Sequence, residues 1–216
     1  YFIDMEFKTD DPNVIIASTF TYNGGEGFIY RSTNAGDSWN KVYTVNGAKR
    51  ITLAVTESET NYIYALSGFW QDDNFNSFDL STDAGKTWIK LADRNDGSPN
   101  ILGRYGSSYN VEGQAWYDLA VGVSPTNSEI VFTGGIDIWK SQGLSNFTQS
   151  SDNRAEGGLP FVHADIHDLQ FTPDGTKVYA ATDGGVAVST NNGVSWTSKN
   201  SGLAITQYYK FAVAAN

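Results

Sequence analysis

The two histidines of the chain lie four residues apart, in a segment that also contains acidic residues. The segment runs from Val162 to Asp168 (VHADIHD), so His163, Asp165 and His167 alternate with apolar residues. In a β-strand this alternation places the three side chains on one face. Two imidazoles and one carboxylate are suitable ligands for a divalent metal such as Zn²⁺ or Ca²⁺. A structural set of hydrogen bonds explains the same trio without any cofactor. The apolar residues that follow share the parity of His167, which predicts that it is the most buried of the three.

A second kind of chemistry is open to the carboxylates. Glycoside hydrolysis uses two carboxyl groups about 5–10 Å apart across the scissile bond. Asp165 belongs to the histidine segment, and Asp183 lies in the polar segment 182–185 (TDGG). Glu112 is a third candidate. If the protein is an enzyme, we expect Asp165 and Asp183 to be its catalytic residues.

Aromatic side chains are interleaved with acids and amides in the longer connecting segments. Such a mixture offers stacking planes and directional hydrogen bonds to sugar rings, although ordinary loop packing would use the same residue types. The candidate ligand-binding residues are Trp70, Tyr105, Tyr109, Glu112, Trp116 and His163.

Composition excludes several classes of partner. The 14 basic and 24 acidic residues give a net charge of −10, whereas nucleic acids and anionic membranes attract positively charged surfaces. The sequence contains no Cys, so disulfides and thiolate-ligated metals are excluded. No apolar run is long enough for a membrane span. Because the chain opens at Tyr1 within an apparent strand, we expect a processed or trimmed product.

The elements that position these residues follow from an internal repeat. One octet recurs as STNAGDSW (32–39), STDAGKTW (81–88) and STNNGVSW (189–196), and a degenerate copy occupies 141–147. The first residues of successive copies are 49, 60 and 48 residues apart. A unit of about 50 residues is typical of a four-stranded propeller blade.

The remainder of each unit repeats as well. An alternating strand, a short turn, an apolar strand, a third strand that leads into the octet and a short fourth strand can be recognised four times. We name these strands a, b, c and d. The predicted blades are about 1–46, 47–92, 115–150 and 163–200, and 205–216 is predicted to be strand a of a fifth blade.

The octet resembles the Asp-box, or BNR, motif S/T-x-D-x-G-x-S/T-W. The chain is therefore similar to Asp-box β-propellers, which include sialidases, xyloglucan hydrolases, sortilin-like receptors and many uncharacterised secreted proteins of Bacteroidetes-type bacteria. The resemblance implies an all-β fold, with the boxes at the c–d hairpins and a secreted or cell-surface location. It assigns Asp83 to a turn, because two of the three good boxes contain Asn at this position.

The resemblance also bears on activity. The TDGG segment is similar to the T-D-x-G-G segment that carries a catalytic aspartate in xyloglucan hydrolases, although its neighbours depart from that pattern. The arginine triad and the F-R-I-P motif of sialidases are absent, so sialidase activity is not expected.

Loop lengths indicate which face carries function. In a propeller the b–c and d–a connections share one end of the channel, here called the loop face. The longest connections expected in this chain fall there, at 69–78, 92–115 and 150–162. Long loops on a rigid repeat scaffold usually carry binding residues. We expect the loop face to bind a glycan or protein, with a glycoside hydrolase as the alternative. Because strand a of a fifth blade is expected, we predict an incomplete propeller whose open blade faces need further blades or a partner chain.

Overall fold

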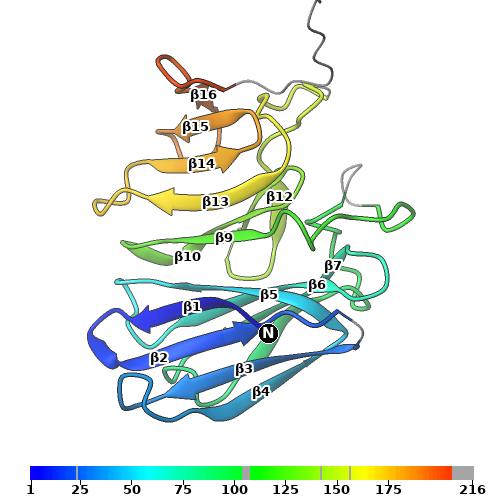
Figure 1. Cartoon of the computed structure of the whole chain (residues 1–216). Helices are drawn as coiled ribbons and strands as arrows, with labels where there is room; N and C mark the ends of the chain where they lie inside the picture. The colour runs from blue at the N-terminus through cyan, green and yellow to red at the C-terminus, as the bar shows by residue number, and fades with distance from the viewer. Residues whose placement is uncertain (23, 104–107, 142, 156, 206–216) are drawn as a thin grey trace, which may run out of the picture.

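The computed structural model describes residues 1–22, 24–103, 108–141, 143–155 and 157–205. These residues form four sheets, each of four antiparallel strands paired in chain order, and contain no helix (Figure 1). The all-β, four-bladed fold is confirmed. Within the same residues, no helix is long and apolar enough to cross a membrane. The predicted fifth-blade strand lies almost entirely outside the described residues.

The strand bounds follow the repeat. Blade 1 comprises β1 (Phe2–Lys8), β2 (Asp11–Thr19), β3 (Glu26–Ser32) and β4 (Asn40–Asn46). Blade 2 comprises β5 (Ala48–Val55), β6 (Ile63–Phe69), β7 (Phe75–Ser81) and β8 (Ile89–Asp93). Blade 3 comprises β9 (Ala120–Ser124), β10 (Asn127–Gly134), β11 (Ile138–Ser141) and β12 (Phe147–Gln149). Blade 4 comprises β13 (Ile166–Phe171), β14 (Val178–Thr182), β15 (Gly185–Ser189) and β16 (Thr197–Ser198).

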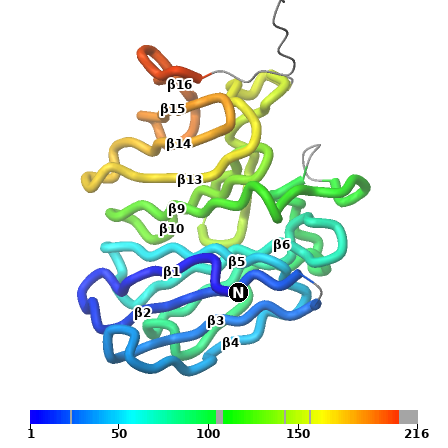
Figure 2. The backbone as a smooth tube through the Cα atoms, in the orientation of Figure 1, coloured from blue at the N-terminus to red at the C-terminus, as the bar shows by residue number. Residues whose placement is uncertain are grey.

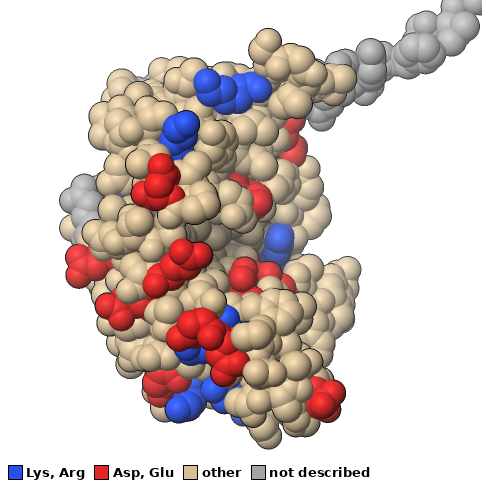
Figure 3. Space-filling model, turned by 90° about the vertical axis from the view of Figure 1, so that its left-hand side faces the viewer, with Lys and Arg blue, Asp and Glu red and all other residues tan. Residues whose placement is uncertain are grey.

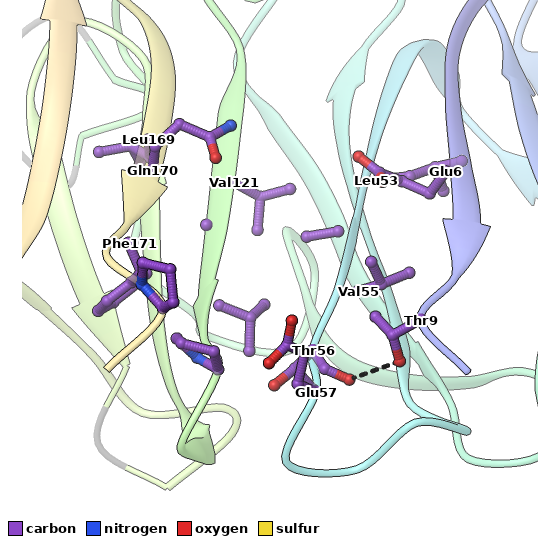
Figure 4. Close-up of a pocket in the computed structure, with 15 residues that line it drawn as sticks. Glu6, Thr9, Leu53, Val55, Thr56, Glu57, Val121, Leu169, Gln170 and Phe171 are labelled. Atoms are coloured by element: carbon purple, nitrogen blue, oxygen red, sulfur yellow. Dashed lines mark hydrogen bonds between the residues drawn. The ribbon is translucent and has the colours of Figure 1, made fainter. Parts of the chain in front are cut away.

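The blades pack on one another in chain order, each along its innermost strand. Strand β1 contacts β5, β5 contacts β9, and β9 contacts β13. Figure 2 shows the resulting progression from blade 1 (blue) to blade 4 (orange). A cavity of about 320 Å³ is lined by residues of all four innermost strands, including Glu6, Leu53, Val121 and Gln170 (Figure 4). The four blades therefore surround part of a propeller channel, as expected of an incomplete propeller.

The hydrophobic core is divided among the three blade interfaces. Ile16 and Ile29 of blade 1 meet Ile51 and Leu53 of blade 2 in one cluster. Blades 2 and 3 share a second cluster and blades 3 and 4 a third. Burying one such side chain contributes about 1.5–3 kcal/mol. The stability of each blade thus depends on its neighbour, as in other repeat proteins.

The octets form tight turns between the third and fourth strands. The fourth residue of every copy has a positive φ: 54° at Ala35, 60° at Ala84, 49° at Leu144 and 57° at Asn192. In the second copy, Oδ1 of Asp83 accepts the backbone N–H groups of Lys86 and Thr87 at 3.0 and 2.9 Å.

The other good copies repeat this turn with an amide. Asn34 and Asn191 accept the N–H of Ser38 and Ser195, respectively, at 3.0 and 2.9 Å. Burial alone would raise the pKa of Asp83, but the hydrogen bonds from Thr87, Ser81 and Lys86 bring it down to about 2. The boxes are structural turns, at the opposite end of the channel from the loop face.

Figure 3 shows this opposite end, where the a–b turns and the boxes lie. Acidic side chains are spread over it, with fewer basic ones between them, and its surface is hollowed between the lower and upper halves.

One expected loop is shorter than predicted. The sequence suggested an expanded connection over 69–78, but β6 extends to Phe69 and β7 begins at Phe75. The turn between them begins with exposed residues and ends buried, with Asp73 7% and Asn74 0% exposed. The long 94–119 connection also enters the core, because Ile101 and Leu102 pack between blades 2 and 3.

Candidate ligand-binding face

The densest polar cluster of the loop face lies between blades 3 and 4. Asp183 occupies the turn between β14 and β15, and its carboxylate accepts hydrogen bonds from the hydroxyl of Tyr117, 3.0 Å from each oxygen. Nε2 of His167 lies 2.6 Å from Oδ1 of Asp183. The rings of Tyr117 and His167 meet edge to face at 4.9 Å. Burial alone would raise the pKa of Asp183, but the hydrogen bonds from His167 and Tyr117 lower it below its ordinary value.

A second carboxyl pair adjoins this cluster. The amide nitrogen of Gln114 donates to Asp118, at 3.0 Å, and to Asp165. Burial raises the pKa of Asp118 to about 8, helped by the charge of Asp165 and by a hydrogen bond between the two carboxyls. The pKa of Asp165 is raised by its own burial and then by the charge of Asp183. Asp118, which is 1% exposed, therefore keeps its proton at neutral pH.

The backbone brings the two clusters together. Asp165 has a φ of 66°, which is unusual for a residue with a side chain. Its carbonyl accepts the N–H of Asp183 at 3.2 Å, and the next residue, Ile166, donates to Gly135 at 2.8 Å. Strained backbone of this kind is concentrated at functional sites. Asp165 and Asp183, predicted as a pair from the sequence, do lie side by side.

A half-buried arginine supports the loop that carries Trp116 and Tyr117. One terminal nitrogen of Arg50, on β5, donates to the carbonyls of Trp116 and Tyr117 at 3.2 and 2.9 Å. Both aromatic side chains remain exposed, 54% for Trp116 and 40% for Tyr117. Arg50 thus fixes the backbone of two solvent-facing aromatic residues.

Further exposed aromatic residues extend the face toward blade 1. Trp70, in the turn after β6, is 39% exposed and lies against Gly25. Beyond that glycine, Tyr22 is 71% exposed and Tyr1 is 61% exposed, and both pack on Phe20. A cavity of about 590 Å³ opens beside this group.

The channel below the face is acidic. A cavity of about 210 Å³ is lined by Asp4, Glu6, Arg50, His167 and Asp168, among others. Burial raises the pKa of Glu6 to about 7, and the charges of Asp4 and Asp168 add to the shift. Acidic residues of the first and fourth blades therefore face the same space.

The other predicted residues have different surroundings. Tyr109 is half-buried beneath the guanidinium of Arg94, 5.3 Å from its ring centre, and that guanidinium also pairs with Asp72. Tyr109 is therefore a packing residue. Glu112 is exposed. Tyr105 lies outside the described residues.

The metal site proposed from His163, Asp165 and His167 is not formed. His163 packs against Gly184, Asp165 contacts Gln114, and His167 contacts Asp183. Within the described part of the chain, no group of three or more His, Asp or Glu side chains is arranged to hold a metal ion. The reason is local: β13 begins only at Ile166, and its pairing shifts between Ile166 and Asp168. For the same reason His167 is exposed rather than buried.

Sequence reasoning missed Tyr117, Arg50 and Asp118 as members of the site. Tyr117 adjoins the predicted Trp116 in the long 94–119 connection, so its position could have identified it as a candidate ligand-binding residue. Arg50 had no such signal, because its role depends on a contact with a residue 66 positions away. Asp118 recurs with Asp4 and Asp168 in the sequence repeat, but nothing in the repeat indicates its contact with Asp165, 47 positions away.

Comparisons with known proteins give the fold. No family model and no curated protein matches the sequence. Solved structures that resemble it include a GH74 enzyme of Niastella koreensis (TM-score 0.58, 17% identity) and a GH74 xyloglucanase of Xanthomonas campestris (0.60, 16%). The chain covers 29% and 30% of these proteins, and each match includes 91% of the chain.

An auxiliary nutrient binding protein of Bacteroides thetaiotaomicron also matches, with a TM-score of 0.51 and 13% identity, over 88% of this chain and 38% of that one. The chain thus spans well under half the length of these relatives. At such low identities the likeness shows the fold alone. The chain is a set of four blades of a β-propeller.

Proposed function

We propose that the loop face binds a carbohydrate, as part of a secreted or cell-surface protein. The observation that carries the proposal is the pair Trp116 and Tyr117: two exposed aromatic rings on a backbone fixed by Arg50, directly beside the carboxylate of Asp183. Flat apolar rings next to fixed hydrogen-bonding groups are suited to sugars, whose rings have apolar faces and hydroxyl edges.

The charge of the molecule supports a neutral ligand. The chain carries a net charge of −10, and the channel behind the site is lined with acidic side chains. Anionic polymers would be repelled from such a surface. Two of the similar structures, a xyloglucanase and a nutrient binding protein, come from proteins whose names are compatible with this proposal.

The test is a binding survey against neutral polysaccharides, followed by calorimetry on the best ligand. Replacing Trp70, Trp116 and Tyr117 together by Ala should weaken binding at least about tenfold, or about 1.4 kcal/mol. Phe7→Ala is the matched control, because Phe7 is an exposed aromatic residue (48%) on the open side of blade 1. Unchanged affinity in the triple variant, or binding of a protein and of no glycan, would refute the proposal.

Glycoside hydrolysis is the second candidate, and a specific observation favours it. Asp165 and Asp183 are adjacent, and their surroundings shift their pKa values in opposite directions, upward for Asp165 and downward for Asp183. Neighbouring carboxyl groups whose surroundings shift their pKa values in opposite directions are typical of the acid and the base or nucleophile of such a reaction. Asp165 would be the acid and Asp183 the base or nucleophile.

Release of reducing ends separates the two functions. A binder leaves the polysaccharide intact, whereas a hydrolase shortens it and loses that activity in both Asp165→Asn and Asp183→Asn. Activity that survives either substitution would exclude this carboxyl pair.

A further inference from the structure

The tryptophan of a good octet packs on the blade before it. Trp88 of blade 2 stacks on Tyr43 of blade 1, with ring centres 5.6 Å apart and planes 9° apart. Trp196 of blade 4 meets Phe132 of blade 3 edge to face at 6.1 Å, and its N–H donates to the hydroxyl of Ser150 at 3.2 Å. In both interfaces the octet of one blade packs on the adjoining face of the preceding blade. This face is here called the outer side of the blade.

A basic side chain completes each of these two interfaces. Arg31, on β3 of blade 1, donates to the carbonyl of Ala84, the fourth octet residue of blade 2, at 2.7 Å. Lys140, on β11 of blade 3, donates to the carbonyl of Asn192, the same position in blade 4, at 3.1 Å. Both basic residues immediately precede the serine of their own octet.

The interface between blades 2 and 3 has apolar residues at the corresponding positions. Blade 3 carries the degenerate octet, and the residue of blade 2 that corresponds to Arg31 and Lys140 is Leu80, which is 2% exposed. Leu144 occupies the fourth octet position and packs into the same hydrophobic cluster. Thus a basic residue accompanies a good octet in the next blade, and an apolar residue accompanies a degenerate one.

Blade 1 carries a good octet that no described blade covers. On the innermost strands, Leu53, Val121 and Leu169 occupy one repeat position by their strand pairing, and they are 3%, 9% and 2% exposed. Met5 occupies the same position in blade 1 and is 51% exposed.

The octet of blade 1 also lacks, within the described residues, the contacts that the octets of blades 2 and 4 make with a preceding blade. No residue in the described part of the chain donates a hydrogen bond to the carbonyl of Ala35. Trp39, Met5 and Phe2 line an apolar cavity of about 600 Å³. This surface has the composition of one half of a blade interface.

We propose that the open side of blade 1 receives the outer side of a further four-stranded blade, one with Lys or Arg immediately before the serine that ends its third strand. That side chain donates to the carbonyl of Ala35, and an aromatic ring of the same blade packs on Trp39. The occupant is defined by this chemistry, which the interfaces between blades 1 and 2 and between blades 3 and 4 display.

Blade 4 of a second copy does not meet this requirement. Its residue at the position of Arg31 and Lys140 is Val188, which is 4% exposed. Two copies therefore should not close a ring by placing blade 4 on blade 1.

The chain contains no Cys, so Met5→Cys is a clean reporter of coverage by thiol labelling. The test protein carries a second copy of residues 1–48, fused in front of Tyr1. Tyr1 corresponds to Lys49 in the repeat, so the added blade is joined to blade 1 in the same way as blade 1 is joined to blade 2. The added blade brings Arg31 and Tyr43, and the Cys is placed only in the original copy. Labelling should be at least about tenfold slower than in the unextended chain, because access to the thiol is lost.

Three matched variants test the role of the basic residue. Arg31→Leu in the added blade should restore most of the labelling rate. An added copy of blade 4 should leave the rate unchanged, and Val188→Lys in that copy should slow it. Equal protection by all added blades would overturn the role of the basic residue. Absence of protection by the blade 1 copy, or a labelling rate in the unextended chain that falls with protein concentration, would overturn the proposed occupant.

Discussion

Asp118→Asn should stabilise the protein, by an amount that grows as the pH rises. Asp118 is 1% exposed, and burial together with Asp165 raises its pKa to about 8, from an ordinary value of 3.8. The folded state therefore keeps a proton that the unfolded chain releases above pH 4. The free energy of unfolding must then fall as the pH rises from about 4 to about 8.

The size of the effect follows from the same linkage. Each pH unit in this range costs about 1.4 kcal/mol, so the wild-type chain loses about 4 kcal/mol between pH 5 and pH 8 if Asp118 alone titrates. The proton shared with Asp165 makes this an upper limit. Asparagine has the shape of the protonated acid and does not titrate, so the variant avoids the loss.

The assay is urea unfolding at constant ionic strength from pH 5 to pH 8, followed by tryptophan fluorescence. The difference in unfolding free energy between Asp118→Asn and wild type should increase steadily with pH. Asp137→Asn is the matched control, because burial raises the pKa of Asp137 only to about 6, so its difference should stop growing near that pH. Parallel pH profiles for wild type and Asp118→Asn would show that Asp118 does not hold a proton in the folded state.

Three further predictions concern the octets and the site. Trp88→Ala should cost about 3–5 kcal/mol of unfolding free energy and Trp39→Ala clearly less, because only Trp88 is stacked on a preceding blade; equal losses in urea unfolding would argue against this packing. Asp83→Asn should change the melting temperature little, since Asn serves in the sister octets, whereas Asp83→Ala should cost about 1–2 kcal/mol through lost turn hydrogen bonds; similar melting temperatures for the two variants would contradict it. Asp183→Asn should lower the melting temperature at pH 7 and not near pH 3, because a lowered folded-state pKa contributes stability that is lost on acidification; an equal decrease at both pH values would show that the charge is unimportant.

The fold could be read from the sequence because the repeat is explicit. Three octets with Gly and Trp at fixed positions define the turns, and the apolar strands between them define the blades. The Trp of each good octet also suggested a largely buried side chain, but Trp39, Trp88 and Trp196 are half-buried. Trp88 and Trp196 contact the preceding blade, whereas no described blade covers Trp39.

The candidate site could be predicted only in part. Asp165 and Asp183 were named as candidate catalytic residues from the sequence, and they lie next to each other because the segment before β13 meets the β14–β15 turn of the same blade. The metal trio failed because the positive φ of Asp165 and the shifted pairing of β13 break the alternation on which it rested. Asp4, Asp118 and Asp168 occupy one position of the sequence repeat, but Asp118 lies before β9, whereas Asp4 and Asp168 lie within β1 and β13.

Binding of a carbohydrate to the loop face through its exposed aromatic residues, as proposed above, can be tested by NMR. The chain has six tryptophans, so its ¹⁵N NMR spectrum should contain six indole N–H signals, each assignable by a single substitution. Titration with the best-binding polysaccharide fragment should shift the signals of Trp70 and Trp116 to saturation and leave that of Trp139, which is 5% exposed in the core, in place. Saturating binding that leaves Trp70 and Trp116 unshifted would contradict the claim.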